Sequence, residues 1–130
     1  MQQRRLSRDR GSASVTVLMI PFIIVGMMAV VQFGVAAYAR QVVAGAAQDG
    51  ADTAARHNSS VGAGQATADG LVLAAGGHLM SSYSSSGSSD GEIVTIRTQA
   101  DVVRVFPLFP TITVRGAGSA SIERFEPAGP

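Results

Sequence analysis

The chain has 130 residues with a formal net charge of +1, and it contains no cysteine. Disulfides, thiolate metal sites and cysteine nucleophiles are therefore excluded. Residues 1–10 hold four arginines and one aspartate, a charge of +3, whereas residues 11–130 hold six arginines and eight acidic residues, a charge of −2. Lysine is absent and the six arginines stand apart, so the sequence lacks a basic stripe that would track a nucleic-acid backbone. We expect no nucleic-acid partner.

Residues 12–39 form an uncharged and mostly apolar run. Its 28 residues exceed the roughly 20 that a helix needs to cross a bilayer. By the positive-inside rule, the preceding arginines predict that residues 1–11 are a cytoplasmic leader and that the chain after the run lies outside. A cleaved secretory signal competes, because Ala37-Tyr38-Ala39 resembles a cleavage site, but the run exceeds the roughly 7–15 apolar residues of such signals. We predict a single-pass protein of the cytoplasmic (inner) membrane, in contact with the lipid bilayer.

The apolar helix is expected to continue outward, giving one helix over residues 12–56. Pro21 should bend its first turns, because proline lacks an amide hydrogen. Small residues recur along the helix, several of them at a spacing of four: Gly26, Gly34, Ala37, Ala46, Ala47, Gly50, Ala51 and Ala54. Small residues let helices approach closely, so we expect a packing surface for copies or relatives of the chain. The simpler interpretation, that alanine merely favours a helix, stays open.

Residues 57–91 are expected to connect this helix to the rest of the exported part. Turn-prone residues at 57–60 are followed by a pattern that predicts a second helix over about residues 63–80. The serine- and glycine-rich residues 81–91 indicate a flexible linker.

Residues 92–130 are predicted to form a small antiparallel β region, which makes the fold class α+β. Stretches rich in Ile, Val and Thr indicate three or four strands, at residues 92–100, 101–106, 111–114 and 119–125. A sheet packed on both helices would bury, in some register, Ile93, Val94, Ile96, Val103, Val105, Ile112 and Val114. The apolar segment 106–110 is either a partner contact or the end of the small core.

Residues that carry chemistry are sparse. His57 and His78 are 21 positions apart, and neither has an acidic or histidine neighbour at the three- or four-residue spacing of helical metal sites. The sequence has no nucleophile elbow, phosphate-binding loop, dinucleotide fingerprint or apolar carboxylate pair. We expect no enzyme activity, no cofactor, no metal and no small-molecule substrate.

The residues around the apolar helix resemble the N-terminal region of TadE-like proteins, the pseudopilins of tight-adherence pilus systems. The resemblance covers about residues 8–56. It depends on Arg10-Gly11-Ser12 before the apolar run, on Gln32-Phe33-Gly34 and Tyr38-Ala39-Arg40 within and after it, and on the alanine-rich stretch around Gly50. Residues 121–125 also resemble the end of some family members.

The resemblance implies a pilin-like architecture and a processed minor pseudopilin. A prepilin peptidase would cut after Gly11 and leave Ser12 as the new N-terminus. The implied partners are this peptidase, an inner-membrane pilus assembly platform and other pilins, with incorporation into a surface pilus as a further expectation. The alternative is an unprocessed bitopic envelope protein whose exported domain binds a partner.

One position departs from the family pattern. Pilin-like proteins usually carry a glutamate five residues after the cut, where this chain has Thr16. The resemblance implies that this glutamate would meet the charged N-terminus of a neighbouring subunit, because two opposite charges in hydrocarbon cost less together than apart. Two explanations stay open: the subunit occupies a special position such as a filament tip or an initiating complex, or it is a divergent protein that does not polymerise.

Overall fold

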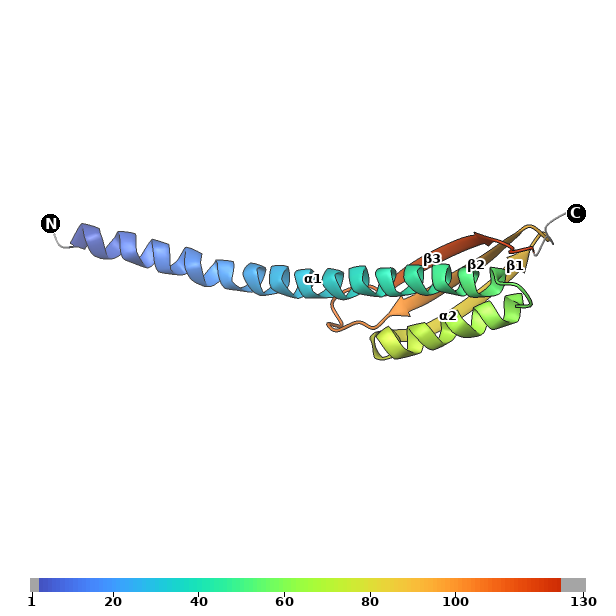
Figure 1. Cartoon of the computed structure of the whole chain (residues 1–130). Coiled ribbons are helices and arrows are strands. Elements are labelled where there is room, and N and C mark those ends of the chain that lie inside the picture. The colour runs from blue at the N-terminus through green and yellow to red at the C-terminus, as the bar shows by residue number, and fades with distance from the viewer. Residues whose placement is uncertain (1–2, 125–130) are drawn as a thin grey trace, which may run out of the picture.

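The computed structural model describes residues 3–124, with side chains from residue 11 onward. A long helix carries a small domain at one end (Figure 1). The elements in chain order are α1 (Gln3–Ala55), α2 (Val61–Gly76), the short 3-10 helix η1 (Gly77–Leu79), β1 (Met80–Ser89), β2 (Ile93–Val102) and β3 (Ile112–Ser121). The expected α+β fold is confirmed, with a long N-terminal helix, a short second helix and one antiparallel sheet.

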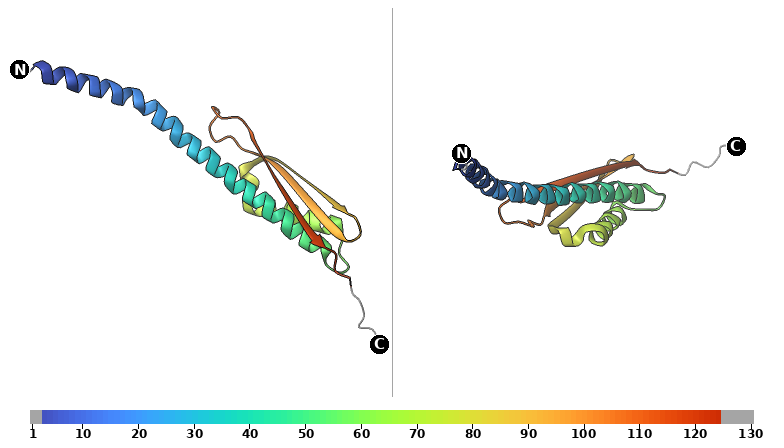
Figure 2. Two further views of the ribbon diagram at one scale, coloured as in Figure 1. Left: turned by 90° about the horizontal axis from the view of Figure 1, so that it is seen from above. Right: turned by 90° about the vertical axis from the view of Figure 1, so that its left-hand side faces the viewer.

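The helix α1 is continuous but not straight. It includes Pro21, and Figure 2 shows a gentle bend in the N-terminal half, as expected where a proline removes a backbone hydrogen bond. The helix ends at Ala55, and Asn58 adopts a positive φ of 60° in the turn that follows. The predicted turn at residues 57–60 is therefore confirmed.

The helix α2 runs back alongside the outer half of α1 (Figure 1). Its first turn is capped by Ser60, whose hydroxyl oxygen accepts a hydrogen bond from the Ala63 amide at 3.1 Å. Near its other end, the Tyr38 hydroxyl of α1 donates to the Ala75 carbonyl at 3.0 Å. Both ends of α2 are thus held, and its Ala68 and Val72 are buried in the core.

The three strands form an antiparallel sheet in the order β1-β2-β3. One face of the sheet packs on α1 and α2, and its buried side chains include Val94, Ile96, Ala100 and Val114. Thr98 is buried on the same face, and its hydroxyl donates to the Val43 carbonyl of α1 at 2.7 Å. This bond satisfies a polar group that would otherwise destabilise a small apolar core.

The strand β3 lies directly on the backbone of α1. A Cβ added to Gly116 would lie 2.6 Å from the Val43 carbonyl oxygen, and one added to Gly118 would overlap the Cα of Gln48. Glycine is therefore required at these two of the inward positions of the strand, because a side chain there would push the helix and the sheet apart. The two glycines explain how a domain with few bulky residues still packs closely.

Several sequence-based expectations for the β region were wrong. Residues 81–91 are not a flexible linker, because most of them form strand β1, paired along its length with β2. The expected stretches 92–100 and 101–106 contribute to the single strand β2, which ends at Val102 and leaves residues 103–106 in a loop. The stretches 111–114 and 119–125 contribute to the single strand β3, which ends at Ser121. Ile93 and Val105, expected in the core, are 45% and 46% exposed. Phe125, the last residue of the fourth expected stretch, lies outside the described residues.

Candidate membrane and assembly surface

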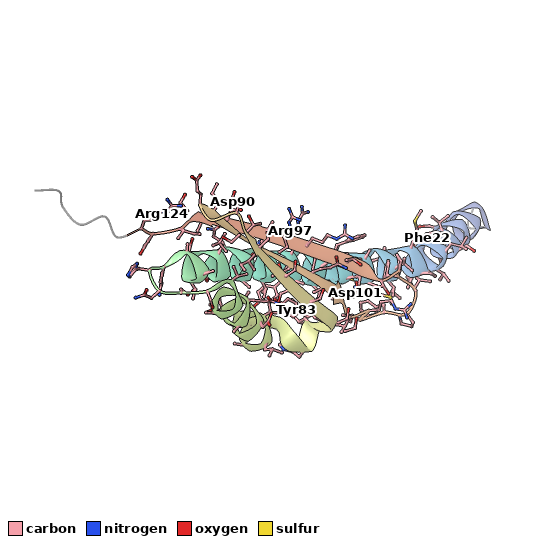
Figure 3. All side chains as sticks on the ribbon, turned by 90° about the vertical axis from the view of Figure 1, so that its right-hand side faces the viewer. Phe22, Tyr83, Asp90, Arg97, Asp101 and Arg124 are labelled. Carbon is pink, nitrogen blue, oxygen red and sulfur yellow. The ribbon has the colours of Figure 1, made fainter. Side chains whose placement is uncertain are left out.

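The N-terminal half of α1 is apolar and projects beyond the domain. Side chains from residue 11 to residue 27 are all exposed within the chain, among them Phe22 at 75% (Figure 3). By length and composition, the helical segment Gly11–Ala55 contains a stretch able to cross a membrane, with a mean hydropathy of 2.5 in its most apolar window. Such a surface needs a lipid or protein environment, because exposing it to water opposes the hydrophobic effect.

The predicted cleavage position lies within this helix. Gly11 and Ser12 are both helical and exposed, and a Cβ on Gly11 would meet no other atom within 4 Å. The helix was expected to begin at residue 12, but α1 begins at Gln3. The arginine side chains of the expected leader, residues 1–11, lie outside the described side chains. The environment of the cleavage position is thus an open helix surface.

Thr16 stands at the position of the usual pilin glutamate, and its hydroxyl is hydrogen-bonded within its own helix. Its hydroxyl donates to the Ser12 carbonyl at 2.9 Å, one turn earlier. Threonine commonly bonds back in this way inside helices, and the bond removes its only donor from the surface. This side chain carries no charge to offer a neighbouring subunit.

The small residues divide into two groups along α1. Gly26 and Gly34 have open space where a Cβ would stand, and Ala37 is exposed. The outer group is buried inside the chain, and it consists of Ala46, Ala47, Gly50, Ala51 and Ala54. The partners of this outer group are α2 and the sheet of the same chain. Of these small residues, only Gly26, Gly34 and Ala37 are therefore accessible for contacts with other molecules.

Gln32 belongs to the residues that carry the family resemblance, but its structural role was not predicted from the sequence. Its side chain is fully buried, and it holds the chain just after β2 with both ends of its amide. The Nε2 donates to the Val103 carbonyl at 3.2 Å, and the Oε1 accepts from the Val105 amide at 3.0 Å. The available signal was its position, since it is the single amide side chain in the uncharged run of residues 12–39.

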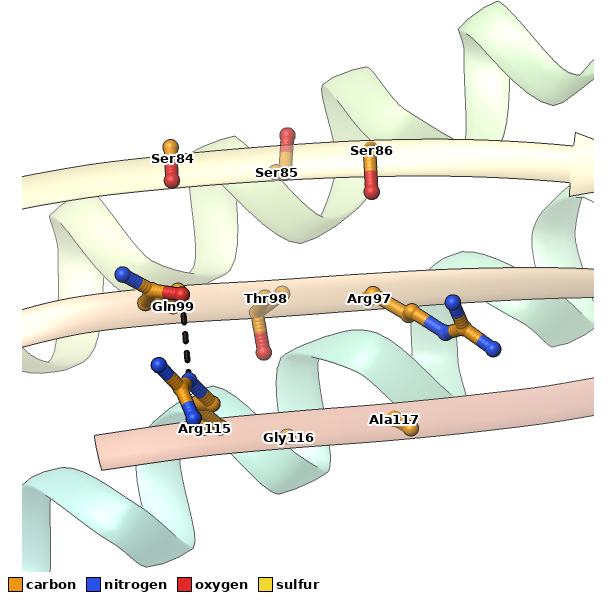
Figure 4. Close-up of a pocket in the computed structure, with 9 residues that line it drawn as sticks. All are labelled: Ser84, Ser85, Ser86, Arg97, Thr98, Gln99, Arg115, Gly116 and Ala117. Carbon is orange, nitrogen blue, oxygen red and sulfur yellow. Dashed lines mark hydrogen bonds between the residues drawn. The ribbon is translucent and has the colours of Figure 1, made fainter. Parts of the chain in front are cut away.

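The opposite face of the sheet is polar and open. A shallow hollow of about 450 Å³ lies on this face. Figure 4 shows the residues that line it, among them Ser84, Ser86, Arg97, Gln99 and Arg115. The Arg115 Nε donates to the Gln99 Oε1 at 3.1 Å. In the described part of the chain, no group of histidine, cysteine or acidic residues could hold a metal ion. This face offers hydrogen-bonding groups but no arrangement of a nucleophile with a base.

Two carboxylates on the outer side of the sheet stabilise local structure. Asp101 accepts hydrogen bonds from the hydroxyls of Thr113 at 2.6 Å and Ser82 at 3.0 Å, one from each neighbouring strand, and these bonds lower its pKa. Asp90 accepts from the backbone amides of Ile93 at 2.7 Å and Glu92 at 2.9 Å in the β1–β2 turn, and its pKa is lowered for this reason. Both carboxylates hold strands in place.

Tyr83 is the one titratable side chain on the inner face of β1. Burial, followed by the nearby Asp69 carboxylate, raises the pKa of its hydroxyl to about 12. Asp69 itself accepts a hydrogen bond from the Ser85 hydroxyl at 2.6 Å, which ties α2 to β1. Because a phenol with so high a pKa stays protonated in the physiological range, Tyr83 contributes packing rather than acid-base chemistry.

The exposed apolar half of α1 and the small α+β domain at its other end define the chain as a membrane protein of the single-pass class. Residues 11–52 match the family model described as TadE-like protein, and the predicted resemblance is confirmed over this segment. This match connects the chain with tight-adherence pili, whose TadE-like components are structural or assembly proteins. Comparisons with curated proteins and with solved structures gave no match.

Proposed function

We propose that the chain is a minor pseudopilin, a structural or assembly subunit of a tight-adherence pilus. The observation that carries this proposal is the coincidence of two boundaries. The TadE-like match begins at Gly11, and the uncharged, mostly apolar run of the sequence begins at residue 12. A helical segment that has no apolar partner in its own chain, as residues 11–27 of α1 have none, is suited to lie in a bilayer and then to pack among similar helices.

In this proposal the subunit enters the cytoplasmic membrane with its N-terminus inside and its domain outside. A prepilin peptidase cuts between Gly11 and Ser12, at a glycine on which an added Cβ would find open space. The assembly platform in the same membrane then delivers the subunit to sibling pilins. The accessible small residues, Gly26, Gly34 and Ala37, are the positions at which sibling helices approach most closely.

The cut can be tested by intact mass spectrometry of the mature chain from its native membrane. A chain that starts at Ser12 supports the proposal, and one that starts at Met1 or Gln2 contradicts it. The variant Gly11→Ala should stay full length, because the peptidase recognises the glycine. The matched control Gly26→Ala changes an equally open glycine of the same helix and should still be cut.

We further propose that Thr16 restricts the subunit to a tip or an initiating complex. The cut creates a charged amino group on Ser12, and the hydroxyl of Thr16 is bonded to the Ser12 carbonyl of its own helix. Without a carboxylate, this subunit cannot neutralise the amino group of a neighbour in hydrocarbon. It therefore suits a place where no neighbour requires that charge.

The variant Thr16→Glu tests this second step. It should change piliation or the recovery of the chain with sibling pilins, because the new carboxylate allows entry at ordinary positions. The control Thr16→Ser keeps the hydroxyl and should behave as the wild type does. Unchanged piliation and unchanged recovery in Thr16→Glu would contradict the special position while leaving the cut at Gly11 intact.

The second candidate, an unprocessed bitopic envelope protein that binds a partner through its domain, is favoured by one observation. Gly11 lies within a continuous helix that begins at Gln3 rather than in an extended segment. A peptidase needs its substrate extended, so the helix would have to unwind locally before cutting. The mass of the mature chain distinguishes the two candidates.

A further inference from the structure

The loop between β2 and β3, residues 103–111, exposes an apolar surface at one end of the domain. Leu108 is 65% exposed and Val105 is 46% exposed. Phe106 and Phe109 pack edge to face, with ring centroids 6.5 Å apart and an interplanar angle of 69°, so the loop has its own rigid aromatic centre. We call these residues, together with Pro107 and Pro110, the apolar loop.

The apolar loop extends along α1 toward the N-terminal half of the helix, away from the β1–β2 turn (Figures 1 and 2). Gln32 fixes it there through its hydrogen bonds to Val103 and Val105. A buried amide in an apolar helix is costly unless both its donor and its acceptor are paired. These bonds satisfy Gln32 and, equally, the two backbone groups of the loop, so the attachment remains favourable in an apolar environment.

The position of Gln32 along α1 determines how deep the loop would lie in a bilayer that α1 crosses. The charged residues nearest the apolar run are Arg10 and Arg40, 30 residues apart, which corresponds to roughly 45 Å of helix. That length matches a bilayer with its headgroups, about 40–45 Å, and the hydrocarbon core of about 30 Å then covers roughly residues 15–35. Gln32 lies about 5 Å inside the edge of that core on the domain side.

We propose that the apolar loop inserts into the outer interface of the bilayer that α1 crosses, and so anchors the domain on the lipid surface. Phe and Leu side chains of segments that anchor a protein on a membrane surface are buried about 5–10 Å into the boundary between headgroups and acyl chains, which is the depth at which Gln32 holds the loop. Arg104 is exposed beside the loop and Arg40 on the helix, and both can reach lipid phosphates from there. The partner is lipid, because the loop is continuous with the membrane-spanning surface and lies at the same level.

This inference rests on α1 crossing a bilayer but on neither the cut at Gly11 nor membership in a pilus. The anchor fixes the domain's tilt and height, because a single helix alone leaves the domain free to lean and rotate.

The chain contains no tryptophan, so one introduced tryptophan reports its own surroundings. The full chain is reconstituted in vesicles of phosphatidylcholine and phosphatidylglycerol, with bromine atoms on the acyl chains either near the headgroup or near the chain ends. Leu108→Trp tests the loop. Phe22→Trp is the reference inside the membrane segment, and Ser88→Trp on the exposed face near the β1–β2 turn is the reference in water.

We expect Leu108→Trp to lose most of its emission with shallow bromines and less with deep ones, and to emit at shorter wavelength than Ser88→Trp. Ser88→Trp should keep its emission in both lipids. If Phe22→Trp is quenched while Leu108→Trp behaves like Ser88→Trp, α1 spans the bilayer but the loop proposal is overturned. A Leu108→Trp signal shielded both from bromolipid and from aqueous iodide would mean that protein covers the loop, which also overturns it. Circular dichroism of each variant verifies its fold.

Discussion

Gly50 of α1 and Gly64 of α2 meet backbone to backbone. A Cβ on Gly50 would lie 2.7 Å from the Gly64 carbonyl oxygen and 3.1 Å from the Ala68 Cβ. A Cβ on Gly64 would overlap the Gly50 carbonyl oxygen and would lie 2.5 Å from the Ala54 Cβ. The two helices therefore pack at a distance that excludes any side chain at their crossing point.

Gly64→Ala should destabilise the domain. The added methyl group forces α1 and α2 apart, and overpacking of this kind costs about 1–3 kcal/mol of the free energy of unfolding. The matched control is Gly70→Ala in the same helix, where a Cβ meets nothing within 4 Å and alanine should gain about 0.5–1 kcal/mol. Urea unfolding of the full chain in detergent, followed by circular dichroism, measures both. Equal effects of the two variants would rule out the close crossing.

Gly118→Ala should separate strand β3 from α1. Its Cβ would overlap the Cα of Gln48 and would lie 2.5 Å from the Ala47 carbonyl oxygen. Neither backbone can yield locally, so we expect the loss of stability to approach the upper end of about 1–3 kcal/mol. Ala117→Ser, on the exposed face of the same strand, should change stability by less than about 0.5 kcal/mol. A mild effect of Gly118→Ala in the same unfolding assay would contradict the direct strand-on-helix contact.

The long helix and the fold class were predictable from the sequence because their signals are strong and local. The uncharged run and the small-residue spacing extend over dozens of residues. The helix α1 ends at Ala55, one residue before its expected end, but begins at Gln3 rather than at residue 12, and α2 spans Val61–Gly76 where about residues 63–80 were expected. Strand β1 was missed because its serines have weak β preference and resemble a linker. Its order comes from pairing with β2 and from Tyr83 and Gly87 facing the core, and that is a tertiary effect.

The candidate site also depends on tertiary contacts that the local sequence does not indicate. Small residues indicated that helices approach one another, but no pattern in the sequence says that the partner at Gly50 is α2 of the same chain. The role of Gln32 depends on Val103 and Val105, more than 70 positions away along the chain. A contact of that range has no local sequence signature. The only available hint was that Gln32 is the single amide side chain in the uncharged run of residues 12–39.

Gln32→Leu should loosen the apolar loop without unfolding the domain. It leaves the Val103 carbonyl and the Val105 amide without partners, at a cost of about 1–3 kcal/mol for each group that stays buried. Hydrogen exchange of the Val105 amide should therefore accelerate, while amides at the centre of β2 stay protected. The control is Gln41→Leu, at an exposed position of the same helix, which should leave the exchange of Val105 unchanged. Unaltered protection at Val105 in Gln32→Leu would show that the loop is held by other contacts.

Acid should weaken the sheet through Asp90 and Asp101. Both have a pKa below the ordinary value of 3.8, Asp90 because the amides of Ile93 and Glu92 donate to it and Asp101 because Thr113 and Ser82 do. Since the folded pKa is depressed, the unfolded chain binds more protons below about pH 5, and the stabilisation present above the unfolded pKa is lost as the pH falls through the folded pKa. The free energy of unfolding, measured from roughly pH 5 to pH 2, should therefore decrease. The double variant Asp90→Asn and Asp101→Asn keeps an acceptor oxygen at each position but removes the ionisation, so its pH dependence should be flatter than that of the wild type. An equally steep decrease in the double variant would assign the acid sensitivity to other carboxylates.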